Sequence, residues 1–142
     1  HTYCLLNVLI DITAIDYIIN DKRFCIVYQF ISTIFNFRLS VKTFLNNYDN
    51  LTSLSNIYRS AGWLEREIWD MFGIFFFNHI DLRRILTDYG FNGFPLRKDF
   101  PLTGFLEISY NEELKRIIYK PLQLSQEFRF FDFQSPWYKF NI

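Results

Sequence analysis

The stretch WLEREIWDMFGIFFFNHIDLRRILTDYGFNGFPLRKD, residues 63–99, joins three kinds of predicted structure in one continuous segment. Residues 63–72 mix charged and apolar side chains with the period of an amphipathic helix. Gly73 stands where a helix commonly ends, and the short apolar run 74–77 predicts a strand. From Asn78 onward, Gly and Pro recur between basic residues, which predicts a loop. We expect the distinctive features of this protein in this segment.

Three strands are expected ahead of it. Residues 5–12 alternate between apolar and other side chains, residues 24–31 are apolar on both faces, and residues 37–45 alternate cleanly. The second strand is therefore expected in the centre of an antiparallel meander, because the connections are short. The expected inward residues of the first strand are Leu6, Val8, Ile10 and Ile12.

The apolar period changes from two to about 3.6 at Thr52, which predicts a helical region up to Phe72. Gly62 interrupts it, so two helices or a kink near residues 60–62 are expected. Further on, residues 105–110 and 115–119 predict a hairpin. We divide the chain into a core domain, 1–77, and a loop-rich arm with an aromatic tail, 78–142.

The composition excludes several classes of function. The 142 residues carry 15 basic and 15 acidic side chains, so no broad positive field is available to bind a nucleic acid. The sequence has no run of about 18 apolar residues, so no membrane span is predicted. The two cysteines, Cys4 and Cys25, lack the spacing of a zinc or iron–sulfur site, and both are expected to be small core residues.

The predicted helix carries four charged residues, Glu65, Arg66, Glu67 and Asp70. Three interpretations of their role are open. Glu67 and Asp70 lie one turn apart and would form an acid–base pair in a dry cleft. An ion-paired, solvated face explains the same pattern. An interface patch is the third, with the carboxylates facing Arg83 and Arg84 or basic groups of a partner.

His79 and the basic loop give weaker signals. His79 has no nearby ligand or nucleophile, which favours a hydrogen-bonded structural role. The segment Leu96-Arg97-Lys98-Asp99 could bind a phosphate or a carboxylate, but no Gly-rich nucleotide-binding motif accompanies it.

These residues resemble a known family. Glu65-Arg66-Glu67, Asp70-Met71-Phe72, His79, Arg83, Ile85 and Leu86 match in type and spacing the signature of the 30 kDa subunit of respiratory complex I, which is called subunit 9 when mitochondrially encoded and has a bacterial C-type counterpart. LIDITAIDY, LRRILTDYGF, PLRKDFPLTG and QEFRFFDFQSPW extend the resemblance over nearly the whole chain.

The resemblance implies an α+β fold, a mainly antiparallel sheet backed by helices, with an extended C-terminal arm. It implies a non-catalytic structural subunit of the peripheral arm of proton-pumping NADH:ubiquinone oxidoreductase, placed beside the large quinone-site subunit and the cluster-bearing subunits. FMN and iron–sulfur clusters are then expected in those partners and none in this chain. The expected location is the matrix side of the mitochondrial inner membrane, with the gene in the mitochondrial genome. Interface or assembly roles are implied for Glu65, Arg66, Glu67, Asp70, His79, Arg83, Arg84, Asp88, Arg97, Lys98, Asp99, Phe131 and Trp137.

Two further expectations complete this interpretation. The family normally has a helical segment ahead of the first strand, so we expect a separate polypeptide to replace it, or its loss. The alternative from another class is a stand-alone hydrolase or lyase that uses the Glu67/Asp70 pair.

Overall fold

The computed structural model describes residues 3–133, 135 and 137. The chain divides into two compact units, His1–Thr103 and Gly104–Ile142, and each is described by itself. The loop that follows residue 77 therefore belongs to the first unit as far as Thr103. The loop groups with the first unit because it forms hydrogen bonds to the end of the helix.

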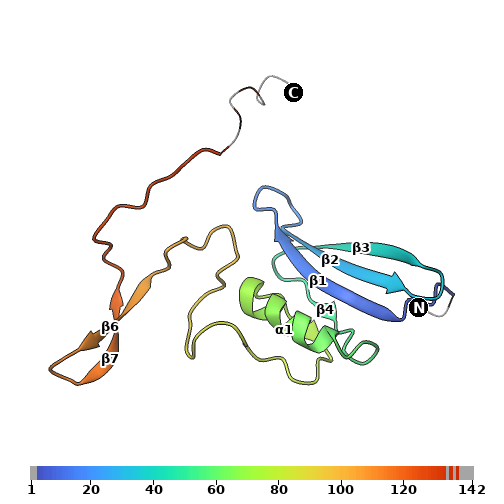
Figure 1. The fold of residues 1–142 in the computed structure, drawn as a ribbon, viewed down its shortest axis with the longest axis horizontal. Coiled ribbons are helices and arrows are strands. Elements are labelled where there is room, and N and C mark those ends of the chain that lie inside the picture. The colour runs from blue at the N-terminus through green and yellow to red at the C-terminus, as the bar shows by residue number, and fades with distance from the viewer. Residues whose placement is uncertain (1–2, 134, 136, 138–142) are drawn as a thin grey trace. The chain divides into compact units, whose positions relative to one another are not determined.

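The first unit is built on an antiparallel sheet in the order β1-β2-β3. These strands are β1 (Val8–Asp16), β2 (Phe24–Ser32) and β3 (Phe37–Leu45). A second element pair is parallel: β4 (Leu51–Thr52) bonds to β5 (Phe76–Phe77). The single helix of the described chain, α1 (Ala61–Phe72), lies along one face of the sheet (Figure 1). The α+β fold class and the meander with a central second strand are thus confirmed.

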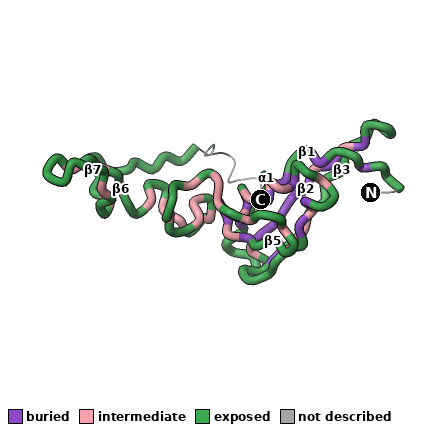
Figure 2. The backbone as a smooth tube through the Cα atoms, turned by 90° about the horizontal axis from the view of Figure 1, so that it is seen from below, coloured by how far each residue is buried: buried purple, intermediate pink, exposed green. Residues whose placement is uncertain are grey.

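The core fills the space between this helix and the sheet, where the buried residues gather (Figure 2). On β2, Phe24 and Ile26 point into it and are almost fully buried, as is Phe76 of β5. From α1, Ile68 and Phe72 pack against the same cluster. Burying each such side chain contributes about 1.5–3 kcal/mol, so the helix is fixed to the sheet mainly by apolar contact.

Two of the four residues expected on the inward face of β1, Leu6 and Ile12, face the core, and the other two do not. The pairing of β1 with β2 shifts register between Leu9 and Asp11, which marks a β-bulge. One extra residue exchanges the two faces of a strand. Val8 and Ile10 are exposed as a result. The residues that face the core are Leu6, Leu9, Ile12 and Ala14.

Only one of the two expected helices forms. Residues 51–52 pair with β5 instead, and the chain then turns, with Leu54 accepting from the N–H groups of Ile57 and Tyr58. The end of α1 is as expected: Gly73 has a left-handed backbone (φ 74°) and its N–H donates to the Trp69 carbonyl. Cys25 is buried as predicted, but Cys4 is exposed in a turn, so that expectation was wrong.

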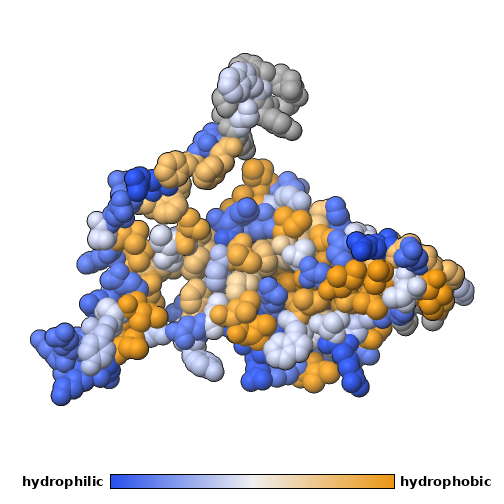
Figure 3. All heavy atoms as spheres, in the orientation of Figure 1, coloured by the Kyte–Doolittle hydropathy of each residue, from blue (hydrophilic) through white to orange (hydrophobic). Residues whose placement is uncertain are grey.

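The second unit contains the predicted hairpin, β6 (Leu106–Asn111) and β7 (Arg116–Pro121). Its register places apolar residues opposite each other on one face, and this face is exposed. The five residues of this apolar stripe are Leu106, Ile108, Tyr110, Ile117 and Tyr119. Apolar side chains are visible on the surface of both units (Figure 3).

Candidate functional site

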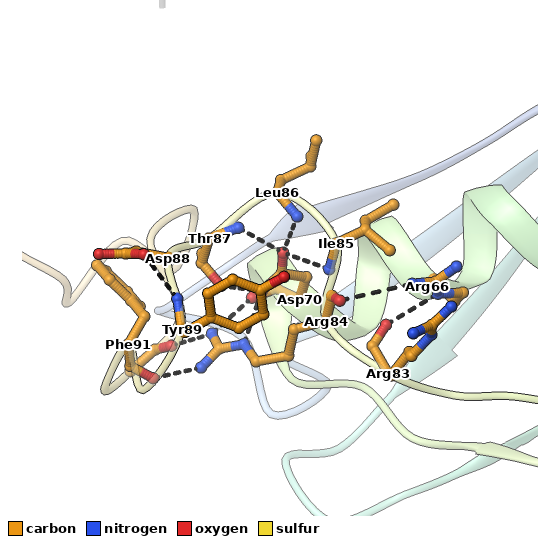
Figure 4. A network of polar contacts seen from close by, with 11 residues as sticks. Arg66, Asp70, Arg83, Arg84, Ile85, Leu86, Thr87, Asp88, Tyr89 and Phe91 are labelled. Atoms are coloured by element: carbon orange, nitrogen blue, oxygen red, sulfur yellow. Dashed lines mark hydrogen bonds and ion pairs between the residues drawn. The ribbon is translucent and has the colours of Figure 1, made fainter.

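Asp70, in the last turn of α1, has a fully buried carboxylate. Its Oδ2 accepts hydrogen bonds from the backbone N–H groups of Ile85 (3.2 Å), Leu86 (2.6 Å) and Thr87 (2.9 Å). Its Oδ1 accepts from Arg84 Nε at 2.6 Å and from the Thr87 hydroxyl at 2.7 Å. Five hydrogen bonds thus enclose one carboxylate (Figure 4).

This environment determines the charge of Asp70. Burial alone raises the pKa of a carboxyl group, but here the hydrogen bonds from Thr87 and Arg84 outweigh burial and hold the pKa well below its ordinary value of 3.8. The group is therefore ionised at neutral pH and has no proton to give. Because both oxygens are already occupied, it is also poorly placed to take one from a substrate.

Arg84 connects the helix end to the loop. Besides its ion pair with Asp70, it donates to the Asp70 carbonyl at 3.0 Å, to the Phe91 carbonyl at 2.6 Å and to the Gly93 carbonyl. Its guanidinium also lies over the rings of Phe91 and Phe94, 5.6 and 5.2 Å from their centroids. By donating to the carbonyl groups of Phe91 and Gly93, Arg84 holds the turn at residues 91–93, so its role here is structural.

Arg97 fixes the next part of the loop to the same helix end. Its Nε donates to the Phe72 carbonyl at 2.6 Å, and its guanidinium lies 4.5 Å from the centroid of Phe94. Burial lowers the pKa of Arg97. The packing is tight at Gly73, where a Cβ would lie 2.6 Å from the Phe94 ring and 2.7 Å from Arg97 Nη2. Glycine suits this position because it has no Cβ to collide with Phe94 and Arg97 and because it adopts a left-handed backbone without strain.

A second ion-pair cluster ties the loop to the sheet, and two of its members were not predicted from the sequence. Arg23 donates to both carboxylate oxygens of the buried Asp16, at 2.7 and 2.8 Å, and pairs with Asp99 at 3.1 Å. Asp16 Oδ2 also accepts from the backbone N–H of Lys98 at 2.8 Å. The hydrogen bond from Arg23 lowers the pKa of Asp16 against the opposing effect of burial, and it lowers the pKa of Asp99. The only signal in the sequence is the pair of opposite charges flanking the turn between β1 and β2.

Glu65 is the second fully buried carboxylate of α1. It accepts from the Leu54 N–H at 2.7 Å and from the Ser53 hydroxyl, and so draws the segment after β4 onto the helix. His79 lies close by, with Nε2 3.7 Å from Glu65 Oε2. Its Nδ1 accepts from the Asp81 N–H at 3.1 Å, which leaves the proton on Nε2 to donate to the Gly62 carbonyl at 3.1 Å. Both ring nitrogens of His79 are thus used within the fold.

The other predicted residues lie at the surface. Glu67 is exposed, so the structure does not bring it and Asp70 together in a dry cleft, and the acid–base pair is not formed. Asp70 faces Arg84, as the interface interpretation allowed within one chain, rather than Arg66. Arg66 instead donates to the carbonyls of Arg83 and Arg84, at 3.0 and 3.5 Å. The exposed members of the predicted set are Glu67, Arg83, Asp88, Lys98, Asp99, Phe131 and Trp137.

Neither a metal cluster nor a membrane-spanning helix occurs in the described part of the chain. Within residues 3–133 and at 135 and 137, no group of three or more His, Cys, Asp or Glu side chains is arranged to hold a metal ion. Among the same residues, no helix has the length and apolar character needed to cross a bilayer.

Comparison with known proteins decides the family. The model of a family described as "Respiratory-chain NADH dehydrogenase, 30 Kd subunit" matches residues 1–106. The chain belongs to this family. The resemblance found in the sequence is thereby confirmed.

The relatives cover most of this chain. The C-type subunit of the NADH-quinone oxidoreductase of Jannaschia sp. (strain CCS1) is 57% identical over 134 residues, which are 94% of this chain and 65% of that protein. The NADH dehydrogenase [ubiquinone] iron-sulfur protein 3 of Oryza sativa subsp. japonica is 53% identical over 137 residues, 96% of this chain and 72% of the relative. The protein of the same name from Beta trigyna is 51% identical over 141 residues, which are 99% of this chain and 73% of that protein. The chain thus spans about two thirds to three quarters of their length.

The names of these relatives describe subunits of one oxidoreductase complex of the respiratory chain. The prediction of a complex I subunit is confirmed at this level. The alternative, a stand-alone hydrolase or lyase, finds no support in them.

Proposed function

We propose that the chain is a non-catalytic structural subunit of the peripheral arm of proton-pumping NADH:ubiquinone oxidoreductase. The observation that carries this proposal is the state of Asp70, a buried carboxylate whose five hydrogen bonds all serve to hold the loop 84–97 on the helix end. The network joins loop and helix and leaves neither Asp70 oxygen free for acid–base chemistry.

The partners of this subunit are the large quinone-site subunit and the cluster-bearing subunits. Support for an extensive interface comes from the second unit. A two-stranded hairpin is marginally stable in water by itself, and here its apolar stripe, defined above, is exposed. The tail adds more exposed aromatic surface at Phe130, Phe131 and Phe133. Exposed apolar surface of this kind marks a protein interface.

The chain's own residues do not fit an iron–sulfur cluster, although the plant relatives carry that term in their names. A cluster of this kind needs four ligands, mostly cysteine thiolates, and this chain has two cysteines, one in a turn and one inside β2. We therefore assign FMN and the iron–sulfur clusters to partner subunits. We also propose that the subunit lies on the matrix side of the mitochondrial inner membrane and that its gene is in the mitochondrial genome.

The proposal is tested by native gel separation of detergent-solubilised mitochondria. Mass spectrometry of the band with NADH-oxidising activity should find this chain at a fixed ratio to the large quinone-site subunit. Its recovery only as a free small protein would overturn the proposal.

A further inference from the structure

Two adjoining hollows lie on the surface beside α1. One, of about 450 Å³, is bordered by Arg59, Gly62, His79 and Ile80; the other, of about 630 Å³, is bordered by Thr87, Tyr89 and Gly90. Three residues border both: Trp63, Arg66 and Arg83. We call the two hollows together the Trp63 surface.

The Trp63 surface combines bare aromatic side chains with excess positive charge. Trp63 is 68% exposed and Tyr89 fully exposed. The smaller hollow contains three arginines, Arg59, Arg66 and Arg83, against one carboxylate, that of Asp81. The larger hollow adds the carboxylate of Asp88 and Arg84, whose charge is paired with Asp70. Asp81 pairs with Arg83 at 3.0 Å, whereas no ion pair is found for Arg59 or Arg66 among the described residues. Two positive charges of the smaller hollow thus have no carboxylate partner within the described chain.

Arg66 is fixed in position before any partner binds. Its Nε is held by the Arg83 carbonyl at 3.0 Å, and its guanidinium lies 5.1 Å from the centroid of the Trp63 ring. Arg66 and the two backbone carbonyls that it contacts are seen together in Figure 4. A side chain ordered in advance loses less conformational freedom on binding. Tryptophan, tyrosine and arginine are also the residues that carry most binding energy at protein interfaces.

From this geometry we infer that the Trp63 surface binds an acidic segment of another subunit of the complex. Carboxylates of that segment pair with Arg59 and Arg66, and an apolar side chain of the segment covers the Trp63 ring. The neutral net charge of the chain and the small size of the basic patch favour a protein segment over a polyanion. This inference rests on the proposed function and adds the chemistry of one partner.

The test places an amine in the hollow of the assembled complex. Arg59 is exposed, and its side chain makes no hydrogen bond or ion pair within the described chain that a substitution would break, so Arg59→Lys keeps the charge and the fold. A carbodiimide, which joins an amine to a carboxylate in direct contact, is then applied to the isolated complex. Mass spectrometry should find an amide link from position 59 to an Asp or Glu of a second subunit. Arg38→Lys, an exposed arginine on β3, is the matched control and should give no such link.

A second pair of variants tests the charge. Arg59→Glu should lower the retention of this chain in the complex at raised salt by about fivefold, because one attractive pair becomes repulsive; Arg38→Glu should leave it unchanged. If the chain is present in the complex but position 59 links to nothing or only to carboxylates of its own chain, the inference is overturned while the proposed function stands. If the chain is absent from the complex, both are overturned.

Discussion

Replacing Asp70 by asparagine is the sharpest test of the buried network, because the change preserves shape and alters only charge and hydrogen bonding. An asparagine side chain offers one acceptor oxygen and one NH₂ donor. If the oxygen takes the place of Oδ2, it keeps the three backbone N–H groups, and the NH₂ then faces Arg84 and the Thr87 hydroxyl. The hydroxyl can rotate and accept, but the Arg84 guanidinium can only donate. Arg84 therefore loses its anionic partner.

The cost follows from this geometry. Removing one partner of a buried ion pair destabilises a protein by about 3–5 kcal/mol. The Arg84 side chain is 28% exposed and keeps its carbonyl acceptors, so we place the cost at the lower end, about 3 kcal/mol. Glu67→Gln removes the same charge three residues away on the exposed face of α1, and its effect should stay within about 0.5 kcal/mol.

Urea unfolding of the full chain, followed by tryptophan fluorescence, measures this difference. With a typical dependence on urea of about 2 kcal/mol per molar, the midpoint of Asp70→Asn should fall by about 1.5 M, and that of Glu67→Gln should hardly move. Equal midpoints for the two variants would refute the claim that the Asp70 charge is needed to hold the loop.

Three further predictions concern the same region. The folded-state pKa of Asp70 lies below its ordinary value of 3.8, so the ionised carboxylate stabilises the fold above pH 3.8, and this stabilisation is lost as the pH falls below that value. Below pH 3.8, the free energy of unfolding should therefore fall with decreasing pH less steeply in Asp70→Asn than in the unchanged protein, by up to about 1.4 kcal/mol per pH unit. Gly73→Ala adds a Cβ 2.6 Å from an aromatic ring and should cost about 2–4 kcal/mol in urea unfolding, whereas Gly90→Ala, with the same left-handed backbone and open space around it, should cost about 1. His79→Ala removes two hydrogen bonds of a buried ring and should lower the free energy of unfolding by about 2 kcal/mol; Arg83→Ala, at an exposed ion pair, should change it by less than about 1, and equal losses would contradict the structural role of the histidine.

The sequence predicted what depends on neighbouring residues. Alternation of side chains located β1 and β3, and a run that is apolar on both faces located β2. The glycine after Phe72 marked the end of α1, and the segments 105–110 and 115–119 located the hairpin. Each of these signals is local and has a direct steric or solvation cause.

What failed depends on contacts between distant residues. The bulge at Ile10 in β1 leaves no trace in the alternation, so Val8 and Ile10 were wrongly assigned to the inward face, whereas Leu6 and Ile12 were assigned correctly. The segment after Leu51 has a helical pattern, but β5 and the Glu65 carboxylate hold it in another conformation. The partner of Asp70 is 14 residues away in the loop, so helical spacing could not select it, and Arg84 was named only in one of three open interpretations.

The central claim is that this chain organises the complex and takes no part in bond-making, and Arg84→Ala in the assembled complex tests it most directly. The amount of complex is measured on a native gel, and NADH:ubiquinone turnover is measured per assembled complex. We predict less assembled complex, because the loop 84–97 loses its attachment to α1, with unchanged turnover in the complex that remains. Normal assembly with sharply lower turnover would contradict the account.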